Sequence, residues 1–231
     1  MPTDYPSRPF SALYGCAQKL LSIRSQEAQY GRLMAIVATE GDRDTVMETI
    51  VQAFHADPLW SWMFPDEERR GDQHGAIFGL YVNSALPRGG VWMSDERASA
   101  AAVFTQPGLP ELTEEDDARV EPIIRRSLGE HASAALETVH RFEAAIPQGR
   151  TFYYLSLLGT RADSRGRGIG MGLLAELVAL ADLEGQATYL ESTNPDNNRR
   201  YERLGFKAQS SFTTPDDSHT VTTMWRDPVS R

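Results

Sequence analysis

Hydrophobic residues recur along this chain with two periods, one typical of helices and one typical of strands. Apolar positions three or four residues apart predict amphipathic helices, over residues 40–54, 70–85, 112–146, 168–184 and 197–204. Short apolar or alternating runs predict strands, over residues 35–39, 91–94, 98–105, 151–160, 187–192, 206–213 and 220–225. Gly129 is a candidate break in the longest helical region.

The order of these elements indicates a mixed sheet. Only residues 151–192 read as a strand–helix–strand unit, which is the arrangement that joins parallel strands. The last two strands, 206–213 and 220–225, suit an antiparallel pair. We therefore expect an α/β or α+β protein with a central mixed sheet of about six to seven strands flanked by helices.

Length and composition fit one folded domain. The 231 residues are 41% hydrophobic and 24% charged, which excludes a disordered or fibrous chain. The net charge of -9 argues against a nucleic-acid partner and slightly favours small cationic ones. No apolar run is long enough to span a membrane, so no membrane partner is expected. Cys16 is the only cysteine, which excludes an intrachain disulfide and makes a cytoplasmic location the default.

The first 33 residues differ from the rest in charge, with four basic residues against two acidic ones. Gln18 and Lys19 interrupt the best apolar stretch, residues 13–23, so a signal peptide is not expected. This segment is compatible with a transit peptide and with a short N-terminal helix. Met34 directly precedes the first expected strand. We therefore expect an N-terminal extension over residues 1–33 and the functional domain over residues 34–231.

A glycine-rich turn, residues 165–172, joins a buried strand to an amphipathic helix. Glycines allow close approach of a ligand to the backbone, and the free amides at a helix start favour an anion such as a phosphate. Neither the dinucleotide pattern Gly-x-Gly-x-x-Gly nor a Walker A loop fits the residues present. The alternative is that the glycines only permit tight packing of helix on strand.

The turn and a second motif resemble the GNAT superfamily of N-acetyltransferases. The first motif is Arg165-Gly-Arg-Gly-Ile-Gly170, and the second is Asn197-Asn-Arg-Arg-Tyr-Glu-Arg-Leu-Gly-Phe206. Weaker similarity to the puromycin N-acetyltransferase-like branch lies at residues 53–58, 63–65, 154–159 and 189–193. One departure is Thr160-Arg-Ala162, where the family often has Val-x-Pro. The resemblance implies the acyl-CoA N-acyltransferase fold and acetyl-CoA as the co-substrate.

The resemblance also implies which residues bind acetyl-CoA. The pantetheine arm would pair with the backbone of Leu158, Gly159 and Thr160. The pyrophosphate would be held by the turn that contains Arg165, Gly166, Arg167, Gly168, Ile169, Gly170 and Met171. Arg165 would orient the loop or contact a phosphate, with a solvated surface arginine as the alternative. Asn197 would bond the cofactor or cap a helix, and Asn194 is a second candidate for either role.

Tyr201 and Glu191 are the candidate catalytic residues. The family transfers the acetyl group by direct attack of the amine through a tetrahedral intermediate, which must expel a thiolate. The Tyr201 phenol is the leading general acid, with simple packing as the alternative. Glu191 is the nearest candidate base, because the strand 151–158 carries no carboxylate; binding a cationic acceptor or capping a helix are equally open roles. Tyr153 and Tyr154 alternate faces, so only one can enter the pocket.

The acceptor is expected to be a small, cationic primary amine. Trp60, Trp62, Phe64 and Trp92 could line its pocket, although aromatic clusters more often form core. No metal-binding spacing of His or Cys occurs, so no metal is expected. Two other functions stay open: a non-catalytic acyl-CoA-binding or regulatory module on the same fold, and a protein or peptide amine acetyltransferase. The protein is expected to be a monomer or a homodimer.

Overall fold

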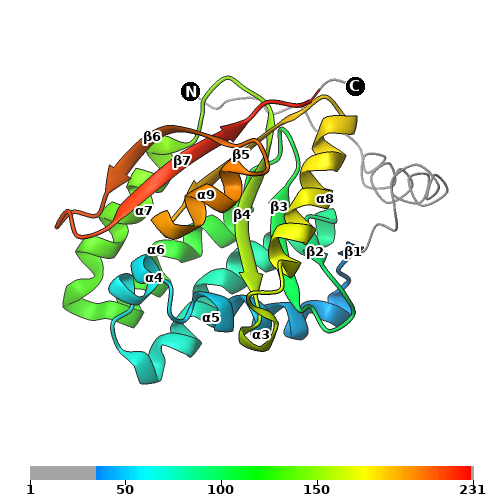
Figure 1. Cartoon of the computed structure of the whole chain (residues 1–231). Helices are drawn as coiled ribbons and strands as arrows, with labels where there is room; N and C mark the ends of the chain where they lie inside the picture. Colours follow the sequence, from blue (N-terminus) through cyan, green and yellow to red (C-terminus); the bar gives the residue numbers. More distant parts are fainter. Residues whose placement is uncertain (1–34, 230–231) are drawn as a thin grey trace.

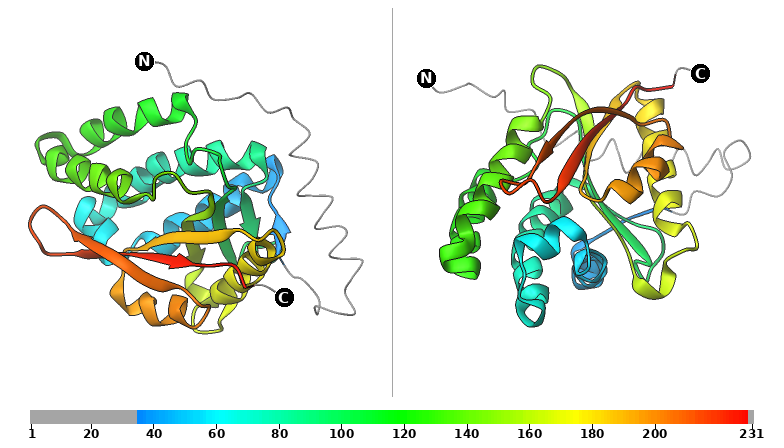
Figure 2. Two further views of the ribbon diagram at one scale, coloured as in Figure 1. Left: turned by 90° about the horizontal axis from the view of Figure 1, so that it is seen from above. Right: turned by 60° about the vertical axis from the view of Figure 1, so that its left-hand side comes forward.

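The computed structural model describes residues 35–229. The predicted extension, residues 1–33, lies outside the described residues, so the domain boundary stays a prediction. Residues 35–229 form a seven-stranded mixed sheet with helices on both faces (Figures 1 and 2), which confirms the predicted fold class. No helix in this part of the chain is long and apolar enough to cross a membrane.

The strands of the sheet lie in the order β1-β2-β3-β4-β5-β7-β6. Their bounds are Ile36–Val37, Val91–Met93, Ala100–Thr105, Phe152–Thr160, Ala187–Ser192, Lys207–Thr213 for β6 and Thr220–Arg226 for β7. Only β4 and β5 pair in parallel, and every other neighbouring pair is antiparallel. The one parallel pair is the strand–helix–strand unit that the sequence predicts.

Seven α-helices and several short 3₁₀ turns lie among residues 35–229. The helices are α3 Arg43–Phe54, α4 Pro58–Met63, α5 Glu67–Ala85, α6 Glu114–Leu128, α7 Ala132–Ala145, α8 Ile169–Leu183 and α9 Asn198–Glu202. Gly129, with φ of 56°, separates α6 from α7 as the sequence suggests. Helix α4 was not predicted; it begins because the Asp57 side chain accepts hydrogen bonds from the amides of Leu59 and Trp60, with Pro58 in the first turn.

Two apolar cores cover the two faces of the sheet. One core joins α3, α5, α6 and α7 to the sheet and includes Ile50, Phe78 and Leu157. The other joins α8 to the opposite face and includes Leu155 and Leu174. Figure 2 shows α8 and α9 on the side of the sheet opposite to α5, α6 and α7.

Strand β4 contains a bulge at Ser156 that reverses which side chains face each core. On β3, Val103 pairs with Leu157 and the next residue, Phe104, pairs with Leu155, so Ser156 is left between them. An extra residue shifts the two-residue alternation of a strand by one position. Leu155 therefore packs on the α8 side, whereas Leu157 packs on the α3 side.

The pairing of β4 with β5 ends at the bulge. The last paired residues are Leu155 and Leu190, although β4 continues to Thr160 and β5 to Ser192. Beyond that point β4 is paired with β3 alone. The edge of residues 156–160 that faces β5 therefore keeps backbone groups that no strand uses.

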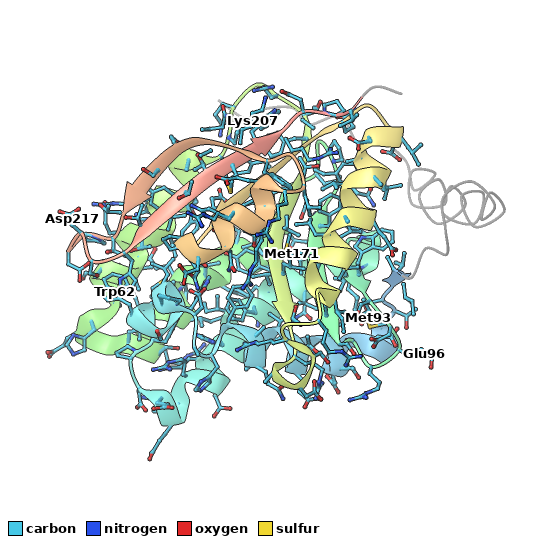
Figure 3. The ribbon with its side chains drawn as sticks, in the orientation of Figure 1. Trp62, Met93, Glu96, Met171, Lys207 and Asp217 are labelled. Carbon is cyan, nitrogen blue, oxygen red and sulfur yellow. The ribbon has the colours of Figure 1, made fainter. Side chains whose placement is uncertain are left out.

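The β6–β7 hairpin closes over α4 at the far end of the sheet. Trp62 Nε1 donates to Asp216 Oδ2 over 2.9 Å, and its ring lies against His219. Figure 3 shows Trp62 next to the hairpin turn at Asp217, while Met171 marks the start of α8. Trp62 therefore stabilises a loop contact and does not line a cavity, contrary to one expectation from the sequence.

The start of α8 lies directly against the end of β4, and a glycine makes this possible. A Cβ added at Gly170 would overlap the Thr160 hydroxyl oxygen but would lie 3.7 Å from Thr160 Cβ, an ordinary contact. A Cβ added at Gly172, two residues along the same helix, would meet nothing within 4 Å. A side chain at position 170 is therefore excluded by steric overlap with one atom, the Thr160 hydroxyl oxygen.

We expect Gly170→Ala to lower the free energy of unfolding by about 1–3 kcal/mol, the usual effect of overpacking. The overlap outweighs the gain of up to about 1 kcal/mol that Ala brings to a helix. Thr160→Ala in the same chain should restore stability, because it removes the overlapping oxygen. Gly172→Ala is the matched control and should be neutral or stabilising. Denaturant unfolding checks all three, and a stable Gly170→Ala single variant would contradict the packing argument.

Candidate active site

Two cavities lie on either side of the point where β4 and β5 part, and they meet at α9. The first, of about 760 Å³, is bounded by the end of β4, the glycine turn, the start of α8, and α9. The second, of about 720 Å³, lies among α3, α4, α5, α6, α7 and the ends of β4 and β5. The residues that line both are Ala53, Asp57, Leu158, Asn197 and Tyr201.

The glycine turn leaves open space and unused amides at the first cavity. Gly166 and Gly168 have φ of 75° and 76°, and an added Cβ at either would meet nothing within 4 Å. Their conformation therefore explains these two glycines, since other residues rarely adopt positive φ. The Gly172 amide bonds the Gly168 carbonyl over 2.8 Å. The amides of residues 169–171 precede that bond and are free to bind an anion.

Arg165 connects the turn to its surroundings. Its guanidinium donates to the carbonyl oxygens of Ala53, over 3.0 Å, and Thr160, over 3.4 Å. Arg165 therefore links the turn to β4 and α3, and it lines the cavity together with Arg200 and Arg203. These three cations suit an anionic ligand.

Most of the predicted cofactor-binding residues line this first cavity. They are Leu158, Thr160, Arg165, Gly166, Gly168, Ile169, Gly170, Met171 and Asn197. Gly159 does not line it, because its α-carbon faces Ile50 and Ala53 of α3. Arg167 is exposed at the turn and is not among the lining residues either. Asn194, not Asn197, forms a side-chain cap, since its Oδ1 accepts from the Asp196 amide.

The second cavity is lined by aromatic and aliphatic side chains and by many carboxylates. The acidic residues that line it are Asp57, Glu111, Glu114, Asp117, Glu143 and Glu191. No Lys, Arg or His is among the described residues that line it. Within residues 35–229, no group of three or more His, Cys, Asp or Glu is placed to hold a metal ion. The carboxylates are instead spread along the walls, an arrangement that suits an organic cation.

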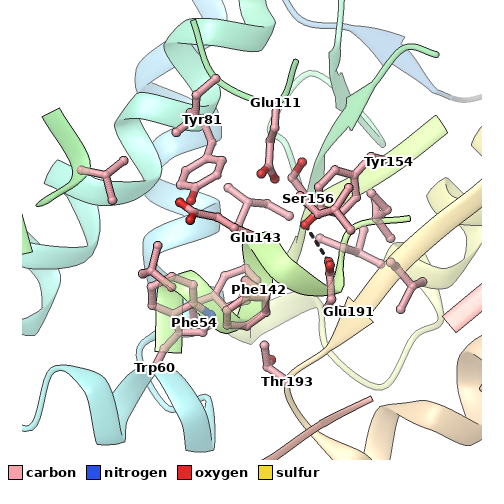
Figure 4. A pocket seen from close by; sticks show the side chains of 18 of the residues that line it. Phe54, Trp60, Tyr81, Glu111, Phe142, Glu143, Tyr154, Ser156, Glu191 and Thr193 are labelled. Atoms are coloured by element: carbon pink, nitrogen blue, oxygen red, sulfur yellow. Dashed lines mark hydrogen bonds between the residues drawn. The ribbon is translucent and has the colours of Figure 1, made fainter. Parts of the chain in front are cut away.

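Glu191 lies at the end of β5 and faces this acidic cavity. The Tyr154 hydroxyl donates to Glu191 Oε2 over 2.6 Å (Figure 4), whereas Oε1 is buried without a partner among the described residues. Burial raises the pKa of Glu191 to about 7, and the Tyr154 bond opposes that rise. A carboxylate with such a pKa can exchange a proton near neutral pH.

Glu111 and Glu143 face Tyr81 in another part of the cavity (Figure 4). Burial raises the pKa of Glu111 to about 8; a hydrogen bond with Ser156 opposes the rise, and the charges of Glu191 and Glu143 add to it. The pKa of Tyr81 is also raised, by burial and then by Glu111 and Glu143. The carboxyl groups therefore repel one another, although Glu143 is exposed to solvent and Glu111 is half-buried.

Tyr201 projects from α9 between the two cavities. Burial raises its pKa to about 12, and the negative charge of Asp57 adds to the rise. The Asp57 carboxylate is fixed there, because it caps α4 and accepts from the Thr193 hydroxyl over 3.0 Å. The Tyr201 phenol is therefore protonated at neutral pH and has a proton to donate.

Some of the aromatic residues that the sequence suggests for the acceptor pocket line the acidic cavity, and others do not. Tyr154 lines the acidic cavity, while Tyr153 points to the other face and donates to Glu184, so one of the two tyrosines enters the pocket as predicted. Trp60 lines the cavity. Phe64 and Trp92 are buried in the core, with 0% and 2% of their surface exposed, and line neither cavity.

The sequence does not predict four other residues that line the acidic cavity, namely Asp57, Tyr81, Glu111 and Glu143. They come from four separate segments and carry no motif. Asp57 lay within the segment that resembles the puromycin branch, but nothing in its spacing connects it to Tyr201.

Comparison with known proteins finds a similar family. The model of the acetyltransferase (GNAT) family matches residues 98–206, from the hairpin turn before β3 through α9. The matched stretch is just under half of the chain and contains both sequence motifs, so the match agrees with the resemblance that they indicate.

Solved structures share the fold at low sequence identity. One, described as histone acetyltransferase HPA2 and related acetyltransferase from Corynebacterium glutamicum, is 22% identical, with a TM-score of 0.63; the match covers 86% of this chain and 97% of that one. The polyamine N-acetyltransferase of Drosophila melanogaster is 16% identical (TM-score 0.57; 84% and 98% covered). Arylalkylamine N-acetyltransferase 2 of Aedes aegypti is 14% identical (TM-score 0.56; 84% and 97% covered).

Proposed function

We propose that this protein transfers the acetyl group of acetyl-CoA to the primary amine of a small cationic molecule. The observation that carries the proposal is the meeting of two unlike cavities at Tyr201. One has the free amides and cations that suit a pyrophosphate, and the other has the carboxylates that suit an amine. Two enzymes that share the fold are named for acetylation of polyamines and of arylalkylamines, which agrees with an amine acceptor.

The residues present fit acetyl-CoA, which supplies the acetyl group as a thioester. The unpaired edge of residues 156–160 suits the pantetheine arm, which would pair with the backbone of Leu158, Gly159 and Thr160 like an added strand. Gly159 needs no side chain for this role. The amides of residues 169–171 suit the pyrophosphate, and Arg165 supports the loop that presents them.

Glu191 and Tyr201 are proposed to move the two protons that the reaction requires. The ammonium of the acceptor must lose a proton before it can attack. Glu191 is suited to accept it, because a carboxyl group with a pKa of about 7 can act as a base at neutral pH. The thiolate that leaves must gain a proton, and the protonated Tyr201 phenol supplies it. Asn197 lines both cavities beside Tyr201 and is proposed to contact the cofactor.

Three further predictions rest on the sequence alone. They are membership of the puromycin N-acetyltransferase-like branch, a cytoplasmic location, and a monomeric or homodimeric state. The N-terminal extension over residues 1–33 and the domain over 34–231 are proposed on the same basis.

Gly168→Val should weaken acetyl-CoA binding by tenfold or more, equivalent to about 1.4 kcal/mol. A β-branched residue cannot hold the positive φ of this position, so the amides that follow would turn away from the cavity. Gly185→Val is the matched control, because Gly185 also has positive φ (63°) and open space but lies after the far end of α8. Calorimetry measures both affinities. Equal affinity of the two folded variants would contradict this role of the turn.

Tyr201→Phe should lower kcat by about 10²- to 10⁴-fold, the usual contribution of a general acid. Acetyl-CoA affinity should change little, because the lost proton matters in the transition state. Tyr153→Phe removes a hydroxyl that bonds Glu184 on the other face and should leave kcat unchanged. Release of free CoA thiol reports the rates. Near-normal turnover of Tyr201→Phe would show that another group protonates the thiolate.

Glu191→Gln should lower kcat at neutral pH and recover part of it at high pH, where the free amine is populated. In the parent enzyme kcat/KM should rise as pH passes about 7, since the base must be ionised. Tyr154→Phe should move this rise to higher pH, because the Tyr154 bond lowers the pKa of Glu191. If Glu191 only binds the acceptor, KM would increase in Glu191→Gln while kcat and the pH profile hold.

A further inference from the structure

The carboxylates of the acidic cavity fall into two groups that come from different parts of the fold. Glu191, on β5, accepts a hydrogen bond from the Tyr154 hydroxyl and lines the cavity. Glu111, in the loop before α6, and Glu143, on α7, face Tyr81 of α5 (Figure 4). Three segments thus bring an acidic and phenolic cluster to a place that the proposed chemistry at Glu191 and Tyr201 does not use.

One buried carboxylate oxygen in this cavity has no partner among residues 35–229. It is Glu191 Oε1, which is fully covered, and Glu191 lines the cavity. An unpaired charge or polar group in a poorly solvated site is unfavourable. Since no cation lines the described walls, a cationic N–H group on a ligand would satisfy this oxygen.

The other walls of the cavity are largely apolar. Figure 4 shows Phe54, Trp60 and Phe142 on one side of the cavity, and Leu157 and Leu158 line it from β4. A ligand that fills the cavity therefore needs an apolar middle and a cation toward each carboxylate group. A simple monoamine would leave Glu111 and Glu143 without a partner.

We propose that the acceptor is a diamine, or a similar molecule with two cations joined by an apolar spacer, and that Glu111 and Glu143 bind the cation that is not acetylated. The proposal rests on the proposed function, since the other amine must lie at Glu191 and Tyr201. Tyr81 is available to accept a hydrogen bond from the distant cation. Glu111 and Glu143 are therefore specificity-determining residues and take no part in the proton transfers.

The state of Glu111 gives a consequence that can be measured without any turnover. Its pKa is raised to about 8 by burial and by Glu191 and Glu143, so Glu111 holds a proton at pH 7 when the site is free. A bound cation favours the ionised carboxylate. Tyr81, from α5, stays protonated at this pH because its pKa is raised, whereas Glu191 can also lose its proton. A diamine that binds at pH 7 should therefore release protons.

The first experiment compares α,ω-diamines with monoalkylamines and amino alcohols of the same chain length as acceptors. At the best length, the diamine should have a KM at least tenfold lower than its monoamine. Glu111→Gln and Glu143→Gln should each raise KM for the diamine by about tenfold or more, change it little for the monoamine, and leave kcat within about twofold. Glu115→Gln, an exposed α6 position outside the cavity with the same change in charge, should alter nothing.

The second experiment measures diamine binding by calorimetry in two buffers of different ionisation enthalpy. We expect net proton release at pH 7, reduced in Glu111→Gln, and an affinity loss of about tenfold in the same variant. Gln has the same uncharged state that Glu111 has in the free protein at pH 7, so the unfolding temperature should not fall; this shows that any loss of binding is not a loss of fold.

The possible failures of the two proposals differ. If monoamines and diamines are acetylated equally well, and both Gln variants behave like the parent, the diamine proposal is overturned while the acetyltransferase activity stands. If no amine releases CoA thiol from a folded protein, the proposed function fails. Diamine binding that weakens in Glu111→Gln would then still support the two-cation site, and absence of diamine binding would overturn it.

Discussion

The parallel pairing of β4 with β5 ends after four residues, and the site depends on where it ends. That point coincides with the Ser156 bulge, where β4 uses one extra residue against β3. The parting exposes a backbone edge on β4, opens the space below the glycine turn, and leaves the end of β5, with Glu191, facing a cavity. A sheet paired to the end of both strands would have no room for the thioester.

Electrostatics divides the space made by this parting into two unlike halves. Helix amides and arginines line one half, and carboxylates without a balancing cation line the described walls of the other. The acidic half is unfavourable for the free protein, since burial raises the pKa of both Glu111 and Glu191. Proteins tolerate such unfavourable groups at sites where a ligand compensates them. The fold keeps the two halves apart with Leu158 and joins them at Tyr201.

The sequence predicts the parts of the site that depend on local conformation. The turn at Gly166 and Gly168 can be predicted from the sequence, because positive φ before a helix favours glycine at fixed positions. Tyr201 can be predicted because it lies within one continuous motif. The sequence does not predict the bulge, because residues 152–160 are almost all apolar and show no alternation of polar and apolar side chains that a bulge would interrupt. It does not predict Glu111 and Glu143 either, since only tertiary packing of α5, α6 and α7 brings them together. The sequence also supplied Glu191, but only by position on its strand.

The same charge distribution links acceptor binding to the acid chemistry of Tyr201. Asp57 adds its negative charge to the burial that raises the pKa of this phenol to about 12, which makes the free enzyme a weak proton donor. Asp57 also lines the acidic cavity, so a cationic acceptor bound there opposes its effect on the phenol. The phenol then becomes a stronger acid, closer to the basicity of the thiolate that it must protonate. In the proposed mechanism, Tyr201 would thus be a better acid toward the leaving thiolate when an amine is in place.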